Sequence, residues 1–248
     1  MERIIAKNES EVPSMKTVGI IGGMGQWATV DILRRILKAS VDYPVPQYGN
    51  RGYPKMNIRF VNKAPMILNP DGSYPEKLEP SEVLLETAEF VGKSSDFIIV
   101  TSNTAHIFAK QIEERAGKQL INLIDLAIAE AVRRNYKKVG VLAIGVTLRE
   151  KLFQNVLKKH GIESVVLPEQ LENKLDEQAI YPLQEGEKLQ NIPEVAMESV
   201  EYLRAKSVDS IILGCTELPI LLGDEADKTD IINPSQLVAV TAIKKALE

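Results

Sequence analysis

The sequence predicts an α/β protein made of two similar halves, and three observations support this. Short apolar runs alternate with longer segments of helical period, which is the pattern of a parallel sheet wrapped by helices. Several apolar runs lack polar alternation, as expected of strands that are buried on both faces. The two halves of the chain also repeat short segments in the same order.

The individual elements follow from these patterns. Eight runs are predicted as strands: Val18–Ile21, Met56–Phe60, Phe97–Val100, Leu120–Ile121, Val139–Leu142, Ser164–Leu167, Ile211–Leu213 and Ile231–Ile232. Seven segments are predicted as helices: Ala28–Ser40, Ser81–Gly92, Ala105–Ala116, Leu123–Arg134, Thr147–His160, Glu194–Lys206 and Gln236–Leu247. The proline-rich stretch Pro44–Pro80 predicts long loops around one strand.

The internal repeat sets the domain organisation. Segment 16–21 resembles 137–142, and 96–104 resembles 209–217, so that Ser102 and Cys215 each stand six residues after an aspartate. We predict two pseudo-symmetric Rossmann-like domains with parallel sheets, one of residues 1–120 plus 226–248 and one of residues 121–225. Because α/β sheets bind ligands at the carboxyl ends of their strands, facing halves would place Ser102 and Cys215 on opposite walls of one cleft.

Composition excludes several classes of function. Charged residues make up 26% of the 248 residues and the formal net charge is -4, which argues against a general nucleic-acid surface. The single cysteine excludes an internal disulfide and fits a reducing compartment. Residues 1–14 lack the apolar core of a signal peptide, and no apolar run approaches the roughly 20 residues that span a bilayer. We therefore expect a cytoplasmic protein without membrane contact.

The first motif is the run Gly22-Gly23-Met24-Gly25 between a predicted strand and a helix. Its spacing is not that of a dinucleotide loop, and no acidic residue closes a following strand at the expected distance. Exposed amides at a helix N-terminus would equally hold a carboxylate. A tight turn without a ligand is the structural alternative.

The second motif is Ser102-Asn103-Thr104-Ala105-His106, also at a strand end. Its small polar side chains can donate hydrogen bonds to an anion, although Ser102 or Thr104 would also serve as a plain helix cap. His106 is either a base or a hydrogen-bonded structural histidine.

The third motif is Gly214-Cys215-Thr216-Glu217. A lone buried cysteine is usually an inert apolar residue. Here the predicted helix N-terminus would favour the thiolate, and the matching Ser102 in the other half supports a functional thiol.

Together these three motifs resemble the signatures of aspartate racemases, within the aspartate/glutamate racemase superfamily. The likeness covers nearly the whole chain from Lys16 onward, including Thr147, the stretch from Lys174 to Tyr181, and the closing 231–234. The resemblance implies racemization without a cofactor or metal, by two cysteines on opposite faces of the substrate in a cleft between the two domains. It also implies a homodimer that interconverts L- and D-aspartate.

The resemblance assigns roles to individual residues. Ser102 and Cys215 take the two catalytic positions, where the family uses one thiol and one thiolate to exchange the Cα proton. The reference pKa of a thiol is about 8.5, which is close enough to neutral pH for the protein to adjust it to this task. Charge that develops on the substrate carboxylate needs preorganised donors. The expected substrate-binding residues are Met24, Asn103, Thr104, Thr147, Lys174 and Thr216. His106 and Glu217 are expected to contact the two catalytic residues and adjust their acidity without touching the substrate.

Two departures from the family pattern matter. Ser102 replaces the first cysteine, and its hydroxyl is a far weaker acid than a thiol, so turnover should be impaired. A natural divergence and a deliberate replacement of cysteine both fit this position, and the second is favoured because the surrounding residues are kept. No arginine lies between Asn62 and Gly72, where the family places one, so Arg51 or Arg59 is expected to substitute.

Other functions fit the sequence less well. Within the family, a glutamate racemase or a racemase of broad acidic substrate range is the alternative. From another class, the chain could be a Rossmann-like module that binds a nucleotide or an anion without catalysis. A dinucleotide binder should change the fluorescence of Trp27 with NAD(P), whereas a racemase should respond to aspartate.

Overall fold

The computed structural model describes residues 4–42, 45–187 and 193–248, which form two compact units. Unit 1 contains the described residues of 1–101, 108–122 and 235–248. Unit 2 contains 102–107 and the described residues of 123–234. The short segment 102–107, which includes the second sequence motif, thus belongs to the same unit as Cys215.

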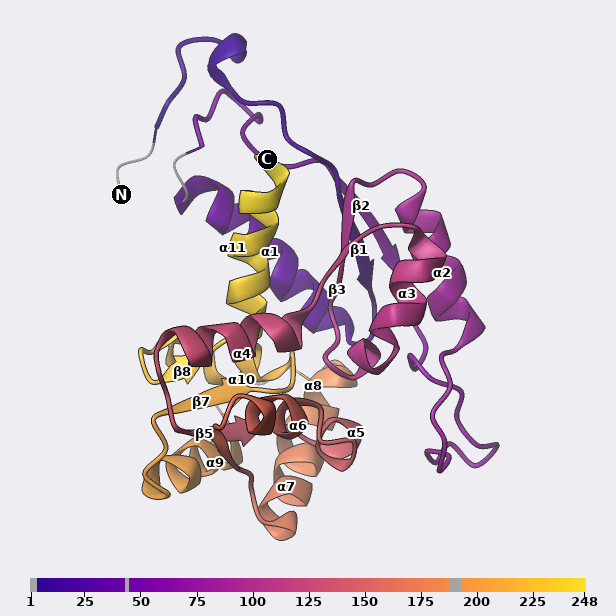
Figure 1. The fold of residues 1–248 in the computed structure, drawn as a ribbon, viewed down its shortest axis with the longest axis vertical. Coiled ribbons are helices and arrows are strands. Elements are labelled where there is room, and N and C mark those ends of the chain that lie inside the picture. The colour runs from indigo at the N-terminus through magenta and orange to yellow at the C-terminus, as the bar shows by residue number, and fades with distance from the viewer. Residues whose placement is uncertain (1–3, 43–44, 188–192) are drawn as a thin grey trace. The chain divides into compact units, whose positions relative to one another are not determined.

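Unit 1 is built on a four-stranded parallel sheet of order β2-β1-β3-β4. Its strands are β1 (Val18–Gly22), β2 (Met56–Phe60), β3 (Phe97–Val100) and β4 (Leu120–Ile121). Its helices are η1 (Glu9–Glu11), α1 (Gln26–Asp42), α2 (Glu82–Gly92), α3 (Ala109–Ala116) and α11 (Pro234–Ala246). Figure 1 shows α2 and α3 on one side of β1 and β3, with α1 and α11 on the other.

Unit 2 repeats this plan with a second parallel sheet of order β6-β5-β7-β8. Its strands are β5 (Lys138–Leu142), β6 (Glu163–Val165), β7 (Ser210–Leu213) and β8 (Ile231–Ile232). Its helices are η2 (Thr104–Phe108), α4 (Leu123–Arg133), α5 (Gly145–Arg149), α6 (Leu152–Lys159), α7 (Glu169–Leu175), η3 (Asp176–Ile180), α8 (Tyr181–Gln184), α9 (Glu194–Ala205), α10 (Leu218–Leu222) and η4 (Gly223–Asp227). Helix α9 packs on β5 and β7, whereas α4 contacts β8 and α6 contacts β6.

The repeat seen in the sequence is confirmed in the topology, since each sheet has its first strand between its second and third. The two repeated aspartates also make the same local contact. Asp96 accepts the amide of Thr17 at 2.6 Å, and Asp209 accepts the amides of Lys137 and Lys138 at 2.6 and 2.9 Å. Each carboxylate thereby joins the start of the unit's first strand to the start of its third. The predicted α/β class and the two similar sheets are correct.

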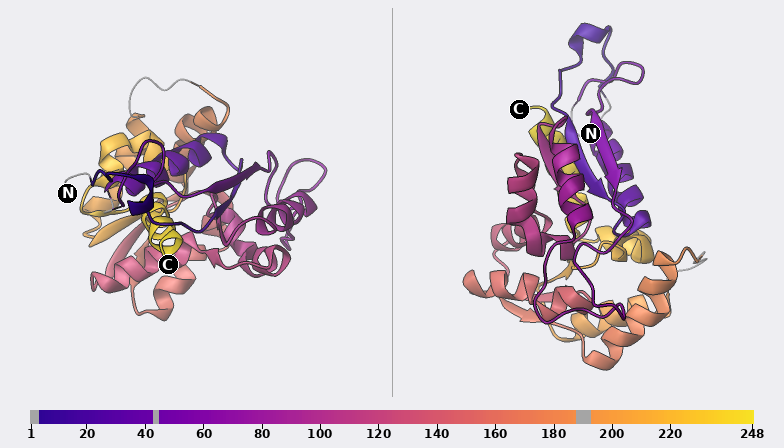
Figure 2. Two further views of the ribbon diagram at one scale, coloured as in Figure 1. Left: turned by 90° about the horizontal axis from the view of Figure 1, so that it is seen from above. Right: turned by 90° about the vertical axis from the view of Figure 1, so that its right-hand side faces the viewer.

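The strands agree closely with the sequence prediction, and the helices agree less well. The helix predicted for 147–160 is broken into α5 and α6, because Lys151 adopts a left-handed backbone with φ of 54°. The helix predicted for 105–116 begins as the 3-10 helix η2 and becomes α-helical only at Ala109. Helices α7 and α8 were not expected, and the helix expected after Cys215 is the five-residue α10. The stretch 61–80 is the predicted long loop (Figure 2), while Pro44 at the start of that prediction lies outside the described residues.

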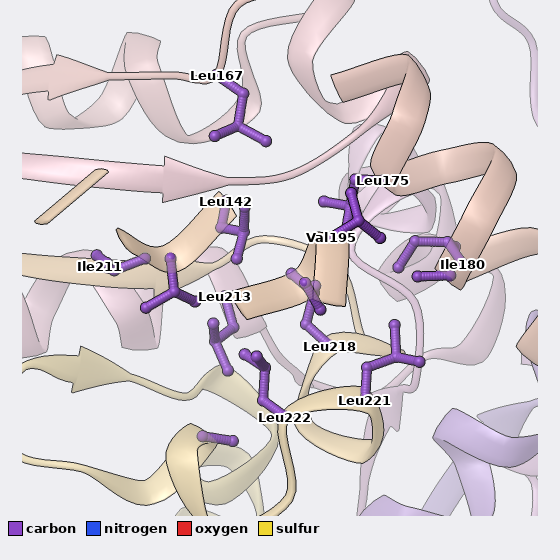
Figure 3. Packing of buried hydrophobic residues seen from close by; sticks show 14 of the residues in the cluster. Leu142, Leu167, Leu175, Ile180, Val195, Ile211, Leu213, Leu218, Leu221 and Leu222 are labelled. Atoms are coloured by element: carbon purple, nitrogen blue, oxygen red, sulfur yellow. The ribbon is translucent and has the colours of Figure 1, made fainter. Parts of the chain in front are cut away.

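The core of unit 2 lies between its sheet and the α7–η3–α9–α10 layer. Figure 3 shows Leu142 and Leu213 from the sheet close to Leu218 and Leu222 from α10. Cys215 packs against this same cluster of buried residues. The core therefore fixes the residues that follow β7 and leaves the thiol only partly exposed. Among the described helices, none is both long and apolar enough to cross a membrane.

Candidate active site

The thiol of Cys215 stands directly after strand β7, as the sequence predicted. The preceding Gly214 donates its amide to the carbonyl of Leu142 at 2.6 Å. A Cβ atom at Gly214 would lie 2.6 Å from the Cβ of Ala143, so only glycine allows β7 and β5 to end this close together. Cys215 is thereby held at the carboxyl edge of the unit 2 sheet, where parallel sheets bind ligands.

The carboxylate of Glu217 gathers three hydrogen bonds beside this thiol. The Cys215 thiol donates to Glu217 Oε2 at 3.1 Å, and the Thr216 hydroxyl donates to the same oxygen at 3.3 Å. The amide of Gln184 donates to the other oxygen at 3.2 Å. Glu217 is only 3% exposed. A buried carboxylate in hydrogen-bond contact with a thiol can accept its proton.

The sequence predicted that a helix N-terminus would favour the thiolate of Cys215, and this prediction is wrong. Helix α10 begins only at Leu218 and has five residues. Burial is the main cause that raises the pKa of Cys215 well above its ordinary value, and the negative charge of Glu217 raises it further. The thiol is therefore protonated at neutral pH, and it needs a proton acceptor before it can act as a base.

The segment from Ser102 to His106 is buried and held from within. The ring of His106 donates from Nδ1 to the Ser102 carbonyl at 2.8 Å, because a carbonyl can only accept. In this tautomer the His106 Nε2 atom accepts the amide of Leu123 at 3.3 Å. Both ring nitrogens of His106 therefore form hydrogen bonds with backbone groups, and one of these groups is the carbonyl of Ser102. His106 thus positions Ser102.

Asn103 offers unused hydrogen-bonding capacity. Its side chain is 3% exposed, and neither its Oδ1 nor its Nδ2 atom has a hydrogen-bond partner. Leaving a buried amide unsatisfied costs about 1–3 kcal/mol. A ligand with both a donor and an acceptor, such as an amino acid, would satisfy both atoms.

Two threonines from distant parts of the sequence meet in the same unit. The hydroxyls of Thr104 and Thr147 lie 3.1 Å apart, and Thr147 is 4% exposed. The structure thus brings together one residue of η2 and one of α5, both of which the sequence selected as carboxylate donors. The pair can present one free hydroxyl proton to an anion after one hydroxyl donates to the other.

Met24 lies in a tightly bound loop of unit 1 between β1 and α1. Thr29 holds this loop, since its hydroxyl accepts the amide of Gly23 and donates to the carbonyl of Gly25, both at 2.9 Å. Gly23 has a φ of +80°, and a Cβ atom there would lie 2.9 Å from the backbone nitrogen of Val61. Glycine is required at this position on both grounds.

The sequence model of the Asp/Glu/Hydantoin racemase family matches residues 21–242 of this chain. The protein belongs to this family.

Individual proteins similar to this chain include racemases. The broad specificity amino-acid racemase RacX of Bacillus subtilis (strain 168) is 24% identical over 234 residues, which cover 93% of this chain and 98% of RacX. A glutamate racemase of Aquifex aeolicus (strain VF5) is 30% identical over 178 residues, which cover 68% of this chain and 64% of the relative. The crystal structure of an aspartate racemase homologue from Pyrococcus horikoshii OT3 superimposes with a TM-score of 0.73 at 22% identity, covering 94% and 100% of the two chains.

The two cations that the sequence selected as substrate-binding residues, Lys174 and Arg59, are engaged elsewhere. Lys174 forms an ion pair with Glu198 of α9 at 2.5 Å, and both side chains are almost half exposed. The guanidinium of Arg59, on strand β2, stacks over the ring of Phe90 at 4.6 Å. Arg51, the other arginine considered, pairs with Glu9. To bind Lys174, Arg51 or Arg59, a substrate carboxylate would have to displace the present partner of that side chain.

Two residues beside the thiol were missed by sequence reasoning. Gln184 binds Glu217, and the negative charge of Asp176 contributes to the raised pKa of Cys215. Both lie in or next to the stretch 174–181 that the resemblance covered, but a polar residue in an amphipathic helix gives no signal of its own. The residues that the structure describes contain no cluster of potential metal ligands.

Proposed function

We propose that this protein is an amino-acid racemase in which Cys215, paired with Glu217, exchanges the Cα proton on one face of the substrate. The observation that carries this proposal is the thiol-to-carboxylate hydrogen bond of 3.1 Å, just past the carboxyl end of strand β7. Because the pKa of the Cys215 thiol is raised, the thiol needs a nearby group that accepts its proton, and Glu217 is such a group.

The proton balance of the proposed step is simple. The Cys215 proton passes to Glu217, which leaves a thiolate and a neutral carboxylic acid with no change in net charge. The thiolate then takes the proton of the substrate Cα, and the electron pair of the broken bond moves onto the substrate carboxylate. Asn103 and the Thr104–Thr147 pair are the proposed donors to that carboxylate, since electrostatic stabilisation of this charge is the largest demand of the reaction.

Inversion needs a second acid on the opposite face, and we assign that role to Ser102. An aliphatic hydroxyl is a much weaker acid than a thiol, so this half of the reaction should be slow. Aspartate is the proposed substrate, with glutamate as the alternative, because the relatives named above include an aspartate racemase homologue and a glutamate racemase.

Hydrogen exchange in deuterated water tests the proposal directly. Because a proton returned by Cys215 retains configuration, one enantiomer of aspartate should lose its Cα proton signal faster than it converts into the other. Cys215→Ala should abolish this exchange. Equal exchange in both enantiomers, or exchange that survives in Cys215→Ala, would assign the chemistry to another base, and L- and D-glutamate measured in parallel decide between the two substrates.

A further inference from the structure

Strand β2 is an edge strand of the unit 1 sheet, and among the described strands only β1 pairs with it. The carbonyl of Lys55 accepts the amide of Val18 in β1 at 2.8 Å, so the odd-numbered residues of this stretch bond to β1. Alternate residues of a strand form their hydrogen bonds to opposite sides. Met56, Ile58 and Phe60 therefore direct their amides and carbonyls to the open edge.

The side chains of these three residues lie on the α1 side of the sheet. The intervening Asn57 points to the α2 side, since its amide donates to the hydroxyl of Ser94, just past α2, at 2.9 Å. Successive side chains of a strand alternate between the two faces. Ile58 and Phe60 are both exposed. The open edge thus presents apolar side chains together with backbone groups that face outward, the combination that favours pairing with another chain.

Helix α1 carries an apolar stripe on its side toward β2. The stripe consists of Val30, Leu33 and Leu37, which follow Gln26 at the spacing of one helix face. Gln26 donates to the side chain of Asn62, two residues past the end of β2, at 3.5 Å, so the stripe begins beside that strand. Val30 and Leu37 are 49% and 41% exposed. The outer face of a helix that packs only on its own sheet is normally polar, so this stripe also lacks a cover.

We propose that β2 pairs antiparallel with β2 of a second copy of this chain and so joins two four-stranded sheets into one continuous sheet. A twofold axis perpendicular to the sheet places Ile58 opposite its own copy and Met56 opposite Phe60 of the partner subunit. Each of these pairs exchanges two backbone hydrogen bonds through the groups that face the open edge. Such an axis keeps the same face of both sheets on one side, so the two α1 stripes meet across it.

A second copy fits this surface better than an extended peptide does. A peptide strand would pair with the edge of β2 but would leave the stripe on α1 exposed, whereas a second copy covers both with the same two elements. The lengths also agree, since the stripe from Val30 to Leu37 runs about 10 Å and the strand from Met56 to Phe60 about 13 Å. The register is self-complementary, because every residue at the open edge meets an apolar residue.

Cysteine cross-linking tests the register. Cys215 is the only cysteine, so Cys215→Ser provides a cysteine-free background. In this background Ile58→Cys should oxidise to a covalent dimer, because paired Cα atoms about 5.5 Å apart lie within disulfide range. Phe60→Cys would meet Met56 of the partner subunit instead of its own copy, and Val132→Cys on α4 is an exposed control in unit 2. No cross-link at Ile58→Cys, or an equal yield in either control, would overturn the proposed pairing.

Sedimentation equilibrium measures the association itself, and the unmodified protein should be a dimer at micromolar concentration. Ile58→Lys removes two apolar side chains from the axis and sets two like charges opposite each other, so the dissociation constant should rise at least ~30-fold. Val132→Lys makes the same kind of change in unit 2 and should leave it unchanged, with circular dichroism to confirm that both variants fold. A monomeric unmodified protein, or a folded Ile58→Lys protein that dimerizes as before, contradicts the proposal. Neither measurement uses a substrate, so both are independent of the proposed racemization.

Discussion

Replacing Glu217 by glutamine should make the Cys215 thiol much more acidic. The change removes one negative charge whose nearest oxygen lies 3.1 Å from the sulfur, while Gln keeps the shape of the side chain. Unit charges about 4 Å apart interact by about 4 kcal/mol at an effective dielectric constant near 20. At about 1.4 kcal/mol per pKa unit this is an upper bound of about 3 units, and solvent at the partly buried thiol reduces it to about 2.

The assay is the alkylation rate of Cys215 by iodoacetamide between pH 6 and 10. A fall of about 2 units raises the thiolate fraction about 100-fold at pH 8, which becomes about a 10-fold faster reaction after the loss of nucleophilicity. Glu217→Asp, which keeps the charge, is the matched control. Turnover should move in the opposite direction, because Glu217→Gln also removes the proton acceptor.

Two results would refute this reasoning. A Glu217→Gln protein that is folded but alkylates at the unmodified rate would show that Glu217 does not act on the thiol. A variant that alkylates faster and also racemizes faster would show that the acceptor is not needed. The second result would leave the electrostatics intact and remove Glu217 from the proton path.

Three further changes test the site and the fold. Ser102→Cys should raise racemization by ~100-fold or more, the scale of one general acid or base, as followed by chiral chromatography, and equal rates would exclude a two-thiol scheme. Lys174→Ala should raise KM for aspartate by the equivalent of about 1.5–3 kcal/mol, whereas Glu198→Gln, which frees this lysine, should lower it; unchanged KM in both removes Lys174 from the site. Asp31→Asn should destabilise unit 1 by about 3–5 kcal/mol in urea, because it removes the negative charge that pairs with Arg35, whose side chain is 5% exposed, and a loss below about 1 kcal/mol would mean that the pair is solvated.

The same physical reason connects the site predictions. A carboxylate beside a thiol can act in two ways, since its charge resists the thiolate and its lone pairs accept the proton. The structure shows Glu217 in contact with the thiol, whereas Asp176 acts on it through its charge.

Much of the fold was already present in the sequence. Strands buried on both faces need contiguous apolar residues, and the run from Val18 to Ile21 shows this directly, with Val18, Ile20 and Ile21 fully buried. The repeat determined that two sheets would share one strand order. The place of Cys215 at a strand end followed from the same local pattern, because strand and loop residues are adjacent in the chain.

The chemical state of the site was decided only by the tertiary structure. The sequence predicted a thiolate from a local feature, the helix N-terminus, but burial and the charges of Glu217 and Asp176 determine that a thiol is present. Gln184 and Asp176 stand 31 and 39 residues before Cys215, and Lys174 meets Glu198 across two helices. Desolvation and charge–charge interaction depend on distance in space, so no pattern of neighbouring residues along the chain contains them.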